Sequence, residues 1–566
     1  MPTRRSFLAQ SGAALTGALL LPALPSCTPG NPLAHIKGQL LGPDAATGHL
    51  LRNPGKLPAP TSTIETDVLI IGGGVAGLSA RRWLHQHGQT NTLLVELAPE
   101  AGGNANAGRN ATSAYPWGAH YLPVPDVRNT ELLAFLQAAG TLTGYAPNGQ
   151  PIYNDYHLCH DPEERLNIEG HWQEGLVPSL GLSTADQAQV ARFFKLTEIL
   201  KAAVGRDGRD AFRIPLDQSS TDEEYRQLDN ITFAAYLDRE GFTTPALRWY
   251  LNYACRDDYG ATAAQVSAWA GLHYFASRKG RAHNATGSDV LTWPEGNQFL
   301  IEHLRRQANA PIRTQTLAYD LRETTTGIEA LLYSVATRQS TRVRARQVLL
   351  ATPQHIAHHL LAAVPGHQLP PPGALHHAPW LVANLTVAGL PQGPGRPLSW
   401  DNVRYGSSSL GYINATQQST KQDDGGPKVI TLYWPLTDEA PGPARRRAYQ
   451  TPYAEWLPRV LAELETYHPG VTPYVQQADL WVWGHGMVAP TPGLLWGAAR
   501  AAAMQSVRGR VFFAHTDFSG VSIFEEGFYQ GIRAAREMLS TTSSPDPLSK
   551  KEGEPDKLGN ASQSTT

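Results

Sequence analysis

Six residues near the start of the chain, Gly72-Gly73-Gly74-Val75-Ala76-Gly77, have types and spacing that suit a phosphate-bearing ligand. They fit the pattern G-x-G-x-x-G. Gly72 permits a tight turn, Gly74 lets the backbone approach a pyrophosphate, and Gly77 lets a helix pack closely on a strand. Free N–H groups at the helix start, those of Val75 and Ala76, carry a partial positive charge that attracts phosphates. Alone, such a turn is a weak indication, because glycine-rich turns are common.

The residues on either side of this turn supply the elements that the pattern requires. Residues 66–71 are an apolar, β-branched run of strand length, and Leu78 and Leu84 continue with helical spacing. A second run, residues 92–96, ends in Glu96, at about the 20-residue distance expected of a carboxylate that holds ribose hydroxyls. Strand, turn, helix and acid together predict a dinucleotide site. Because an acid here repels a 2′-phosphate, NADP is disfavoured, whereas NAD and FAD both remain open.

The sequence after the second strand bears on this choice. Residues 96–104 read ELAPEAGGN, so that Gly102, Gly103 and Asn104 follow the acid. This segment resembles the extended fingerprint of the FAD-dependent flavin amine oxidase and phytoene desaturase superfamily. The resemblance implies that FAD is the cofactor and that these three residues help to bind it. It also implies an α/β fold, in which a Rossmann-like FAD/NAD(P)-binding domain of the glutathione-reductase type carries an inserted α+β substrate domain. The other segments that resemble this superfamily are residues 117–121, 257–269, 293–300 and 346–353.

The C-terminal part of the chain resembles the same superfamily most informatively. Residues 510–514 have the pattern of a buried strand, and Asp517 and a glycine-bearing helical segment at 524–535 follow it. By position, the resemblance implies that Asp517 binds the ribityl or phosphate portion of FAD. It implies that the backbone near Phe524, Glu526 and Gly527 faces the pyrimidine edge of the flavin, where a helix N-terminus stabilises negative charge. A generic amphipathic helix is the alternative, and it would not explain the acid ahead of the helix.

Two halves of one nucleotide site, far apart in sequence, imply a cofactor domain assembled from separate segments. At 566 residues, the chain is long enough for two or more structural units. Ser183 reads as a helix start, and residues 381–387 and 429–434 read as strands. The expected organisation is an FAD-binding domain over 65–124, 291–365 and 481–540, and a substrate domain over 125–290 and 366–480.

The reaction is expected to be that of an FAD-dependent oxidoreductase, an oxidase or dehydrogenase. No second G-x-G-x-x-G follows a strand, so no separate nicotinamide domain is expected. The flavin would take a hydride from a small or apolar organic substrate, as amine oxidases do, and pass electrons to oxygen or another acceptor. His485, in a late aromatic segment, is the first candidate for a base or substrate-orienting residue, and His120 is the second. A structural, hydrogen-bonded histidine is the alternative for both.

Two departures from the superfamily put simple amine oxidation in doubt. Many amine oxidases place a lysine against the flavin through a water, yet this sequence has no lysine between Lys279 and Lys421. Asn104 stands where arginine is frequent. A polyene desaturase or isomerase, or a non-catalytic flavin-fold lipoprotein of the cell envelope, therefore remains an alternative.

The N-terminal residues are typical of an export signal. Arg4 and Arg5 precede a short apolar run at 13–24, which is too short to span a bilayer and resembles a twin-arginine export signal over 1–27. An ordinary secretory signal is the alternative. Cys27 lies in a segment that resembles a lipobox, although Pro25 is unusual there. We therefore expect the twin-arginine export machinery as a partner, a possible lipid anchor at Cys27, and export across a bacterial inner membrane to the periplasm or envelope.

Composition adds several expectations. Residues 28–64 read as a linker and residues 541–566 as a disordered tail, because they hold few large apolar residues. The 47 Lys and Arg and 49 Asp and Glu nearly cancel, which argues against nucleic-acid binding. Cys159 and Cys255 could pair, but buried free thiols are the simpler expectation. His355, His358 and His359 have a metal-like spacing without matching ligands, so no metal is expected.

Overall fold

The computed structural model describes residues 32–286, 288–307, 310–371, 373–419 and 425–542. Residues from Gly38 onward form one compact unit, and the account below concerns that unit alone. The predicted export signal with Cys27, and the predicted tail from residue 543, lie outside the described residues. None of the described helices combines the length and the apolar character that crossing a membrane requires.

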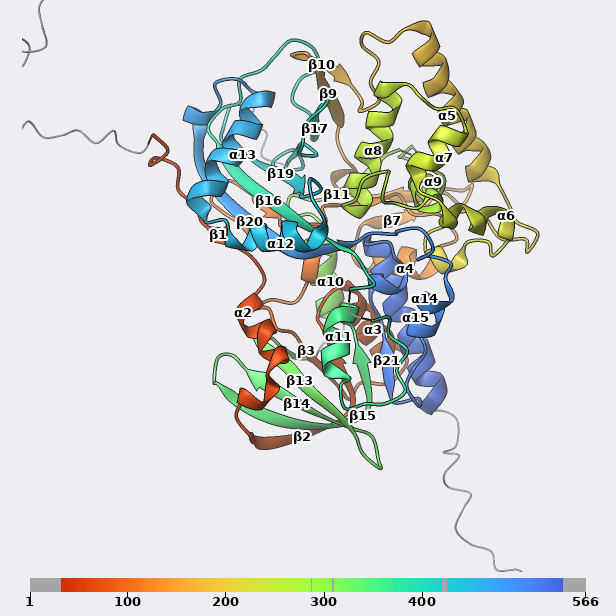
Figure 1. Ribbon diagram of the computed structural model, residues 1–566, viewed down its shortest axis with the longest axis vertical. Helices are drawn as coiled ribbons and strands as arrows, with labels where there is room; N and C mark the ends of the chain where they lie inside the picture. Colours follow the sequence, from red (N-terminus) through yellow and green to blue (C-terminus); the bar gives the residue numbers. More distant parts are fainter. Residues whose placement is uncertain (1–31, 287, 308–309, 372, 420–424, 543–566) are drawn as a thin grey trace, which may run out of the picture. The chain divides into compact units, whose positions relative to one another are not determined.

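One sheet forms the expected nucleotide-binding framework (Figure 1). Its strand order is β12-β3-β2-β15-β14-β13, and β21 also pairs with β15. The pairs β2–β3, β2–β15, β15–β21 and β3–β12 are parallel, whereas β13, β14 and β15 are joined antiparallel. The strands are β2 (Pro60–Ile71), β3 (Thr92–Val95), β12 (Ile312–Arg313), β13 (Thr316–Glu323), β14 (Ile328–Ser334), β15 (Gln339–Leu350) and β21 (Val511–Phe513).

The two faces of this sheet bury alternate residues of the same strands. Val68 and Ile70 of β2 join one apolar cluster, which includes residues of the helices α3 (Val75–Gln86), α10 (Gln298–Gln307) and α15 (Phe524–Thr542). Leu69 and Ile71 join another, which includes residues of α11 (Gln354–Leu360) and α14 (Ala498–Ala503). A strand buried on both faces is typical of a parallel sheet between helices. The apolar run in β2 therefore has its cause in burial on both sides.

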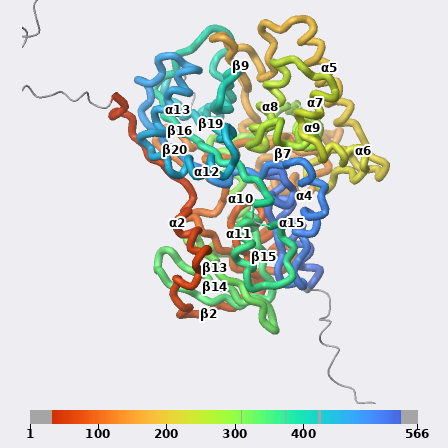
Figure 2. Tube along the Cα trace, viewed as in Figure 1, coloured from red at the N-terminus to blue at the C-terminus, as the bar shows by residue number. Residues whose placement is uncertain are grey.

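Helices from opposite ends of the sequence lie side by side on this sheet. Figures 1 and 2 show α3, near the red end of the colour scale, beside the blue α15. A Cβ atom at Gly531 would lie 2.2 Å from the carbonyl oxygen of Ala76, so only glycine permits this approach. At Gly527, a Cβ atom would lie 3.3 Å from Val75. The glycines of α15 therefore set how closely the two helices pack.

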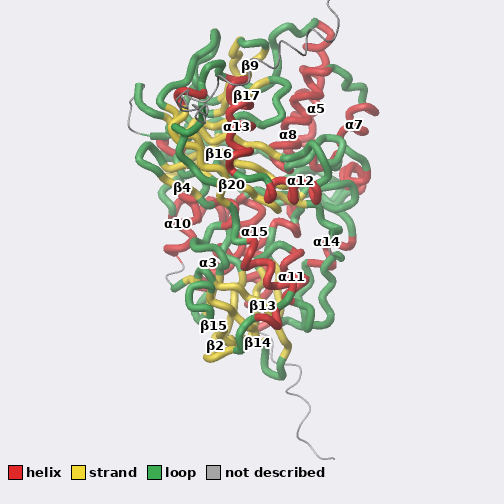
Figure 3. The backbone as a smooth tube through the Cα atoms, turned by 60° about the vertical axis from the view of Figure 1, so that its left-hand side comes forward, coloured by secondary structure: helices red, strands yellow, loops and turns green. Residues whose placement is uncertain are grey.

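A second sheet, separate from the first in Figure 3, has the strand order β1-β20-β16-β19-β18-β17-β9-β10. The predicted strands at 381–387 and 429–434 fall in β16 and β19, which pair antiparallel. Helix α12 packs against β16 and β20. The elements are β1 (Leu40–Leu41), β9 (Glu164–Ile168), β10 (His171–Glu174), β16 (His377–Val387), β17 (Asp401–Arg404), β18 (Tyr412–Asn414), β19 (Lys428–Pro435), β20 (Val475–Val488), α12 (Pro441–Gln450) and α13 (Tyr453–Tyr467).

The remaining helices and short strands lie outside these two sheets. The predicted helix start at Ser183 is confirmed, because Ser183 and Asp186 form a capping box at the start of α5. Cys159 and Cys255 are buried free thiols. The elements are α2 (Ala45–Gly48), α4 (Thr130–Ala138), α5 (Thr184–Ala202), α6 (Glu223–Arg226), α7 (Phe233–Arg239), α8 (Pro245–Tyr259), α9 (Ala268–Ala276), β4 (Ala107–Arg109), β5 (Ala114–Pro116), β6 (Tyr121–Pro123), β7 (Leu142–Tyr145), β8 (Pro151–Tyr153) and β11 (Val290–Thr292), with short 3-10 turns between them.

Two expected boundaries differ from the structure. Residues 38–64 are not a featureless linker: β1 pairs with β20, Leu51 is 6% exposed, and β2 begins at Pro60. Leu51 buries its side chain in the apolar cluster on the α11 face, and residues 60–66 pair with β15. The expected domain boundary at residue 481 falls inside β20. One continuous strand therefore extends across the expected boundary between the substrate and FAD-binding segments.

Candidate active site

A cavity of about 380 Å³ lies at the carboxyl ends of β2 and β3, where the glycine turn begins. Gly72 has φ +108° and donates its N–H to the carbonyl oxygen of Val95, at 2.9 Å. A Cβ atom at Gly77 would lie 2.0 Å from the Gly72 carbonyl oxygen, whereas one at Gly74 would have no atom within 4 Å. Gly77 therefore packs tightly against Gly72 within the turn, whereas the backbone at Gly74 is open to the cavity. Val75 and Ala76, at the start of α3, line the same cavity.

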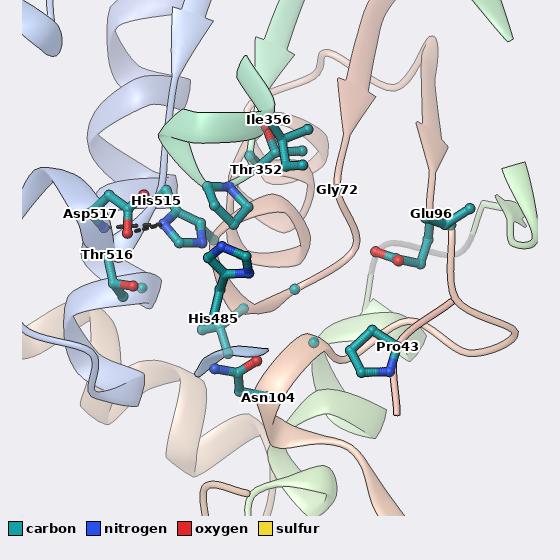
Figure 4. A pocket seen from close by; sticks show the side chains of 18 of the residues that line it. Pro43, Gly72, Glu96, Asn104, Thr352, Ile356, His485, His515, Thr516 and Asp517 are labelled. Carbon is teal, nitrogen blue, oxygen red and sulfur yellow. Dashed lines mark hydrogen bonds and ion pairs between the residues drawn. The ribbon is translucent and has the colours of Figure 1, made fainter. Parts of the chain in front are cut away.

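Glu96 lies at the opposite end of this cavity from Asp517 (Figure 4). Its two carboxylate oxygens accept the N–H groups of Gly73 and Ala98, at 2.7 and 2.8 Å. Burial raises the pKa of Glu96, and these backbone donors oppose the rise. The fixed carboxylate can also accept hydrogen bonds from a pair of hydroxyl groups, as ribose binding requires.

An apolar recess adjoins Glu96 and suits a flat ring such as adenine. Pro43, Gly48 and Leu51 form one side of it, and Leu97 and Leu317 contribute further apolar surface. Pro43, Gly48 and Leu51 were not predicted as site residues, because they lie in the segment interpreted as a linker. The available signal was the apolar sequence of residues 50–51 within that polar segment.

The C-terminal segment lines the same cavity, more than 400 residues from the glycine turn in sequence. His515, Thr516 and Asp517 lie on one side of it, and Phe524 and Gly527 of α15 lie near the start of that helix (Figure 4). Gly102, Gly103 and Asn104 line it as well. One cavity therefore contains both halves of the site that the sequence predicts, with Gly74 and Asp517 on its wall.

Two residues, Glu526 and His485, differ from their expected positions. Glu526 does not line the cavity, because it is fully buried and its Oε1 accepts the N–H of Leu216, at 2.6 Å. Asp517 is 1% exposed, and its carboxylate is already engaged by His377 and by the N–H of Gln354. Asp517 nevertheless lines the cavity, so its contact with the ribityl or phosphate portion of FAD stays a prediction. His485 lines this first cavity and not the neighbouring one described next.

A second cavity, of about 130 Å³, adjoins the first and is walled by aromatic rings. The side chain of His120 stacks on Tyr433, with ring centroids 4.6 Å apart. Its Nδ1 lies 3.3 Å from the carbonyl oxygen of Gly118, and burial lowers the pKa of His120 to about 4. The other aromatic rings in the wall are those of Tyr121, Trp380, Trp483 and Phe524. The residues common to both cavities are Asn104, Ala119, Gly486, Ser522, Ile523 and Phe524.

Acidic side chains are the second feature of this aromatic cavity. Asp257, Asp258 and Glu525 line it. Asp258 forms an ion pair with Arg278, at 2.9 Å. Burial and the neighbouring Asp258 raise the pKa of Asp257, and burial raises the pKa of Glu525 to about 7. Asp257 and Asp258 were not predicted as site residues and entered only within the resembling segment 257–269. The signal that could have identified them is a pair of adjacent acids in a helix with buried neighbours.

The strand β16 contributes Trp380 and Val382 to this cavity. β16 lies in the lysine-free interval between Lys279 and Lys421, so this strand brings no lysine to the wall. Among the described residues that line the aromatic cavity, Arg278 and His120 are the basic ones. Arg278 is paired with Asp258. The groups of the wall that can accept a proton are therefore the carboxylates and the imidazole of His120.

The residues of the first cavity fit a dinucleotide. Gly74 leaves space where a phosphate approaches, Glu96 is fixed for ribose, and the N-termini of α3 and α15 face the cavity. Thr352 also lines it, and the buried hydroxyl of this residue has no hydrogen-bond partner among the described residues. Because buried hydroxyls are nearly always paired, a polar ligand atom is its expected partner.

Comparison with known proteins identifies the family. Residues 75–539 match the family described as flavin containing amine oxidoreductase. The chain belongs to this family. It is an FAD-dependent oxidoreductase, and the predicted fold class and cofactor are confirmed. No curated protein matches the chain in sequence.

Solved structures show the same fold at low sequence identity. Putrescine oxidase bound to putrescine is 14% identical, with 84% of this chain and 100% of that chain covered and a TM-score of 0.59. Cyclohexylamine oxidase from Brevibacterium oxydans IH-35A is 17% identical, with 85% and 100% covered and a TM-score of 0.58. A CLA-producing fatty acid isomerase from P. acnes is 17% identical, with 84% and 98% covered and a TM-score of 0.54.

When bound in this flavoprotein, FAD supplies two-electron hydride chemistry. Glu96 would hold its ribose, and the backbone of Gly74 and Val75 would meet its diphosphate. The residues shared by the two cavities, among them Asn104 and Phe524, would hold its ring system. The aromatic cavity adjoins the first cavity at these shared residues.

Proposed function

We propose that this flavoprotein oxidises a small amine, which enters the aromatic cavity as an ammonium ion. The observation that carries the proposal is the wall of that cavity, where Asp257 and Glu525 accompany the rings of Tyr433, Trp380 and Trp483. Carboxylates attract an ammonium group, and the faces of Trp and Tyr rings stabilise a cation. Such a wall selects a positively charged substrate.

The side chains of the cavity can also prepare the amine for oxidation. An ammonium ion must lose a proton before a hydride leaves the neighbouring carbon. The raised pKa of Asp257 makes its carboxylate a better proton acceptor than an ordinary aspartate. His120, whose pKa of about 4 keeps it neutral at pH 7, is the weaker base and can orient the amine by accepting a hydrogen bond through the nitrogen that does not face Gly118. The aromatic rings keep water from the reacting carbon.

Two further observations favour an amine over a polyene. The cavity measures about 130 Å³ and carries three carboxyl groups, which disfavour a long apolar chain. Two of the similar structures are named as oxidases of putrescine and cyclohexylamine. The similarity to a fatty acid isomerase keeps the polyene or lipid alternative as an outcome of the test.

Anaerobic reduction of the flavin tests the proposal. The FAD-loaded protein is mixed with a monoamine, a diamine and the neutral alcohol of the same carbon skeleton, and flavin absorbance is followed. We expect at least one amine to bleach the flavin and the alcohol to leave it oxidised. The Asp257→Asn variant should reduce kcat/KM for that amine by about 30- to 1000-fold, since loss of one partner of a buried charge pair costs about 2–4 kcal/mol. Asp438→Asn, at an exposed position, is the matched control. Bleaching by an unsaturated fatty acid and by no amine would overturn the proposal.

We further propose that the protein is exported already folded by the twin-arginine machinery and is anchored to the envelope through Cys27. The support is the sequence alone: Arg4 and Arg5 before a short apolar run, with Cys27 in a lipobox-like segment. Fractionation of cells tests it. The Arg4→Lys/Arg5→Lys double variant should stay in the cytoplasm, and Cys27→Ser should lose labelling by a fatty acid. Export that is unaffected by the double variant would favour an ordinary secretory signal.

A further inference from the structure

Four histidines from four different segments converge near Asp517. They are His355 of α11, His377 of β16, His485 of β20 and His515, which follows β21. His355 stacks on His485 with ring centroids 4.2 Å apart, and His377 lies 5.3 and 5.8 Å from these two rings. Three of the four, His377, His485 and His515, line the cofactor cavity. Figure 4 shows His485 and His515 on the same side of that cavity as Asp517.

Asp517 holds two of these histidines in place. The Nε2–H group of His377 donates to Asp517 Oδ1 at 2.8 Å, and Oδ2 accepts the N–H of Gln354 at 2.8 Å. The Nδ1 atom of His515 accepts the N–H of Asp517 at 3.1 Å and lies 3.2 Å from Oδ1. Protonated His515 would therefore have a carboxylate acceptor ready.

The cofactor cavity otherwise lacks cationic side chains. Among the described residues that line it there is no lysine and no arginine, and Asn104 stands where the family resemblance suggests arginine. The diphosphate of FAD brings two negative charges, which the N-termini of α3 and α15 compensate only in part. The imidazoles are the only lining side chains, within the described ranges, that can become cations.

We infer that the histidine cluster beside Asp517 forms the cationic part of the FAD diphosphate site and that this cluster takes up protons as FAD binds. Without an anionic ligand, burial and the neighbouring histidines and Arg445 lower the pKa of His485 to about 2, and the same causes lower that of His355 to about 3. Arg445 of α12 is the nearby arginine, and its guanidinium donates hydrogen bonds to the carbonyl oxygens of His377 and Gly484. Asp517 is the acid that faces the group. A bound diphosphate adds negative charge and favours protonation.

Proton uptake fixes the sign of the pH dependence. If the complex binds more protons than the free protein, the affinity for FAD rises as the pH falls. Uptake of one proton corresponds to a change of up to about tenfold per pH unit. We expect FAD to bind about 10- to 100-fold more tightly at pH 6 than at pH 8.

Titration of the full chain, freed of FAD, tests this inference. Binding is followed at pH 6, 7 and 8 by flavin fluorescence, and calorimetry in two buffers of different ionisation enthalpy counts the protons. Riboflavin, which has no diphosphate, should bind without the pH dependence. A dissociation constant for FAD that is the same at pH 6 and pH 8, with no proton uptake, would overturn the inference. Because wild-type protein gives both readings, they do not depend on a variant that may fail to fold.

Substitutions assign the effect to these histidines. His485→Gln should weaken FAD binding by about tenfold at pH 6, and by less at pH 8. His485→Arg should bind FAD with little dependence on pH, since its charge is permanent. His171→Gln, an exposed position on β10, is the matched control and should behave as the wild type does. A full pH dependence that persists in His485→Arg and in His377→Gln would contradict the assignment. Since flavin binding and not turnover is measured, the result is independent of which substrate is oxidised.

Discussion

Substitution of Gly74 by valine separates the role of this glycine in cofactor binding from any role in folding. Gly74 caps α3 with φ −76° and ψ −174°, an extended conformation that any residue adopts. No atom lies within 4 Å of the position that its Cβ would take. The apoprotein should therefore lose only about 1 kcal/mol, because valine is a poorer N-cap than glycine.

The effect on FAD is much larger. The side chain of valine would occupy the part of the cavity where the backbone of α3 approaches the diphosphate. Loss of two charge-assisted hydrogen bonds, at about 1.5–3 kcal/mol each, costs about 3–6 kcal/mol. We therefore expect FAD to bind at least about 100-fold more weakly.

Two assays on the same protein samples measure these effects. Thermal unfolding without FAD reports on the fold, and titration with FAD reports on the site. Gly144→Val in β7 is the matched control, since its Cβ also has no neighbour within 4 Å. Gly77→Ala is the opposite case: its Cβ would lie 2.0 Å from the Gly72 carbonyl oxygen, so that the apoprotein itself should be destabilised. An affinity of Gly74→Val for FAD within about threefold of the wild type would refute the reasoning.

Three further predictions follow from the same geometry. Glu96→Gln should weaken FAD binding by about tenfold in a fluorescence titration, because an amide keeps one acceptor but loses the charge-assisted bonds to ribose; unchanged affinity would exclude Glu96 from the ribose site. Arg278→Met should lower the free energy of unfolding of the apoprotein by about 3–5 kcal/mol in urea, since it leaves Asp258 buried without its partner; an unchanged midpoint would contradict this. Burial raises the pKa of Glu525 to about 7 from an ordinary value of 4.5, so the native state holds a proton that the unfolded chain has released, and stability falls as the pH rises from 4.5 to 7. Glu525→Gln should therefore melt at a higher temperature than the wild type at pH 8 and at a similar temperature below about pH 5; equal melting at both values would refute the shift.

Local sequence patterns predicted most of the framework. The strand, turn and helix from residue 66 onward are observed, and β2 only extends further toward the N-terminus than expected. The capping box at Ser183 gave a correct helix start, because its two reciprocal hydrogen bonds depend only on residues three apart. The strands β16 and β19 were predictable because apolar and β-branched residues predominate in residues 381–387 and 429–434.

The site was harder to predict where it depends on side-chain direction or on distant segments. Glu525 and Glu526 are adjacent, yet successive helix positions point about 100° apart; Glu525 lines the aromatic cavity and Glu526 bonds to Leu216. Sequence alone could not tell which of the two faces a cavity. The histidines around Asp517 come from four separate segments, and no spacing in the sequence indicates that they meet.

The residues of the apolar recess beside Glu96 were not predicted, for a different reason. Pro43, Gly48 and Leu51 belong to a stretch whose proline, glycine and polar content is typical of linkers. Composition describes the whole stretch, whereas the position of the stretch depends on single residues such as Leu51, whose side chain is buried. The burial of Leu51 depends on the α11 face of the sheet, which only the folded chain creates.

A crystal structure of the protein purified with its cofactor is the most direct test of the central claim, that distant segments of the chain build one FAD site. We expect one FAD molecule with its ribose at Glu96, its diphosphate between Gly74 and His515, and its ring system beside Asn104 and Phe524. A flavin bound elsewhere, or one that contacts the glycine turn but none of the residues from His515 to Phe524, would contradict it.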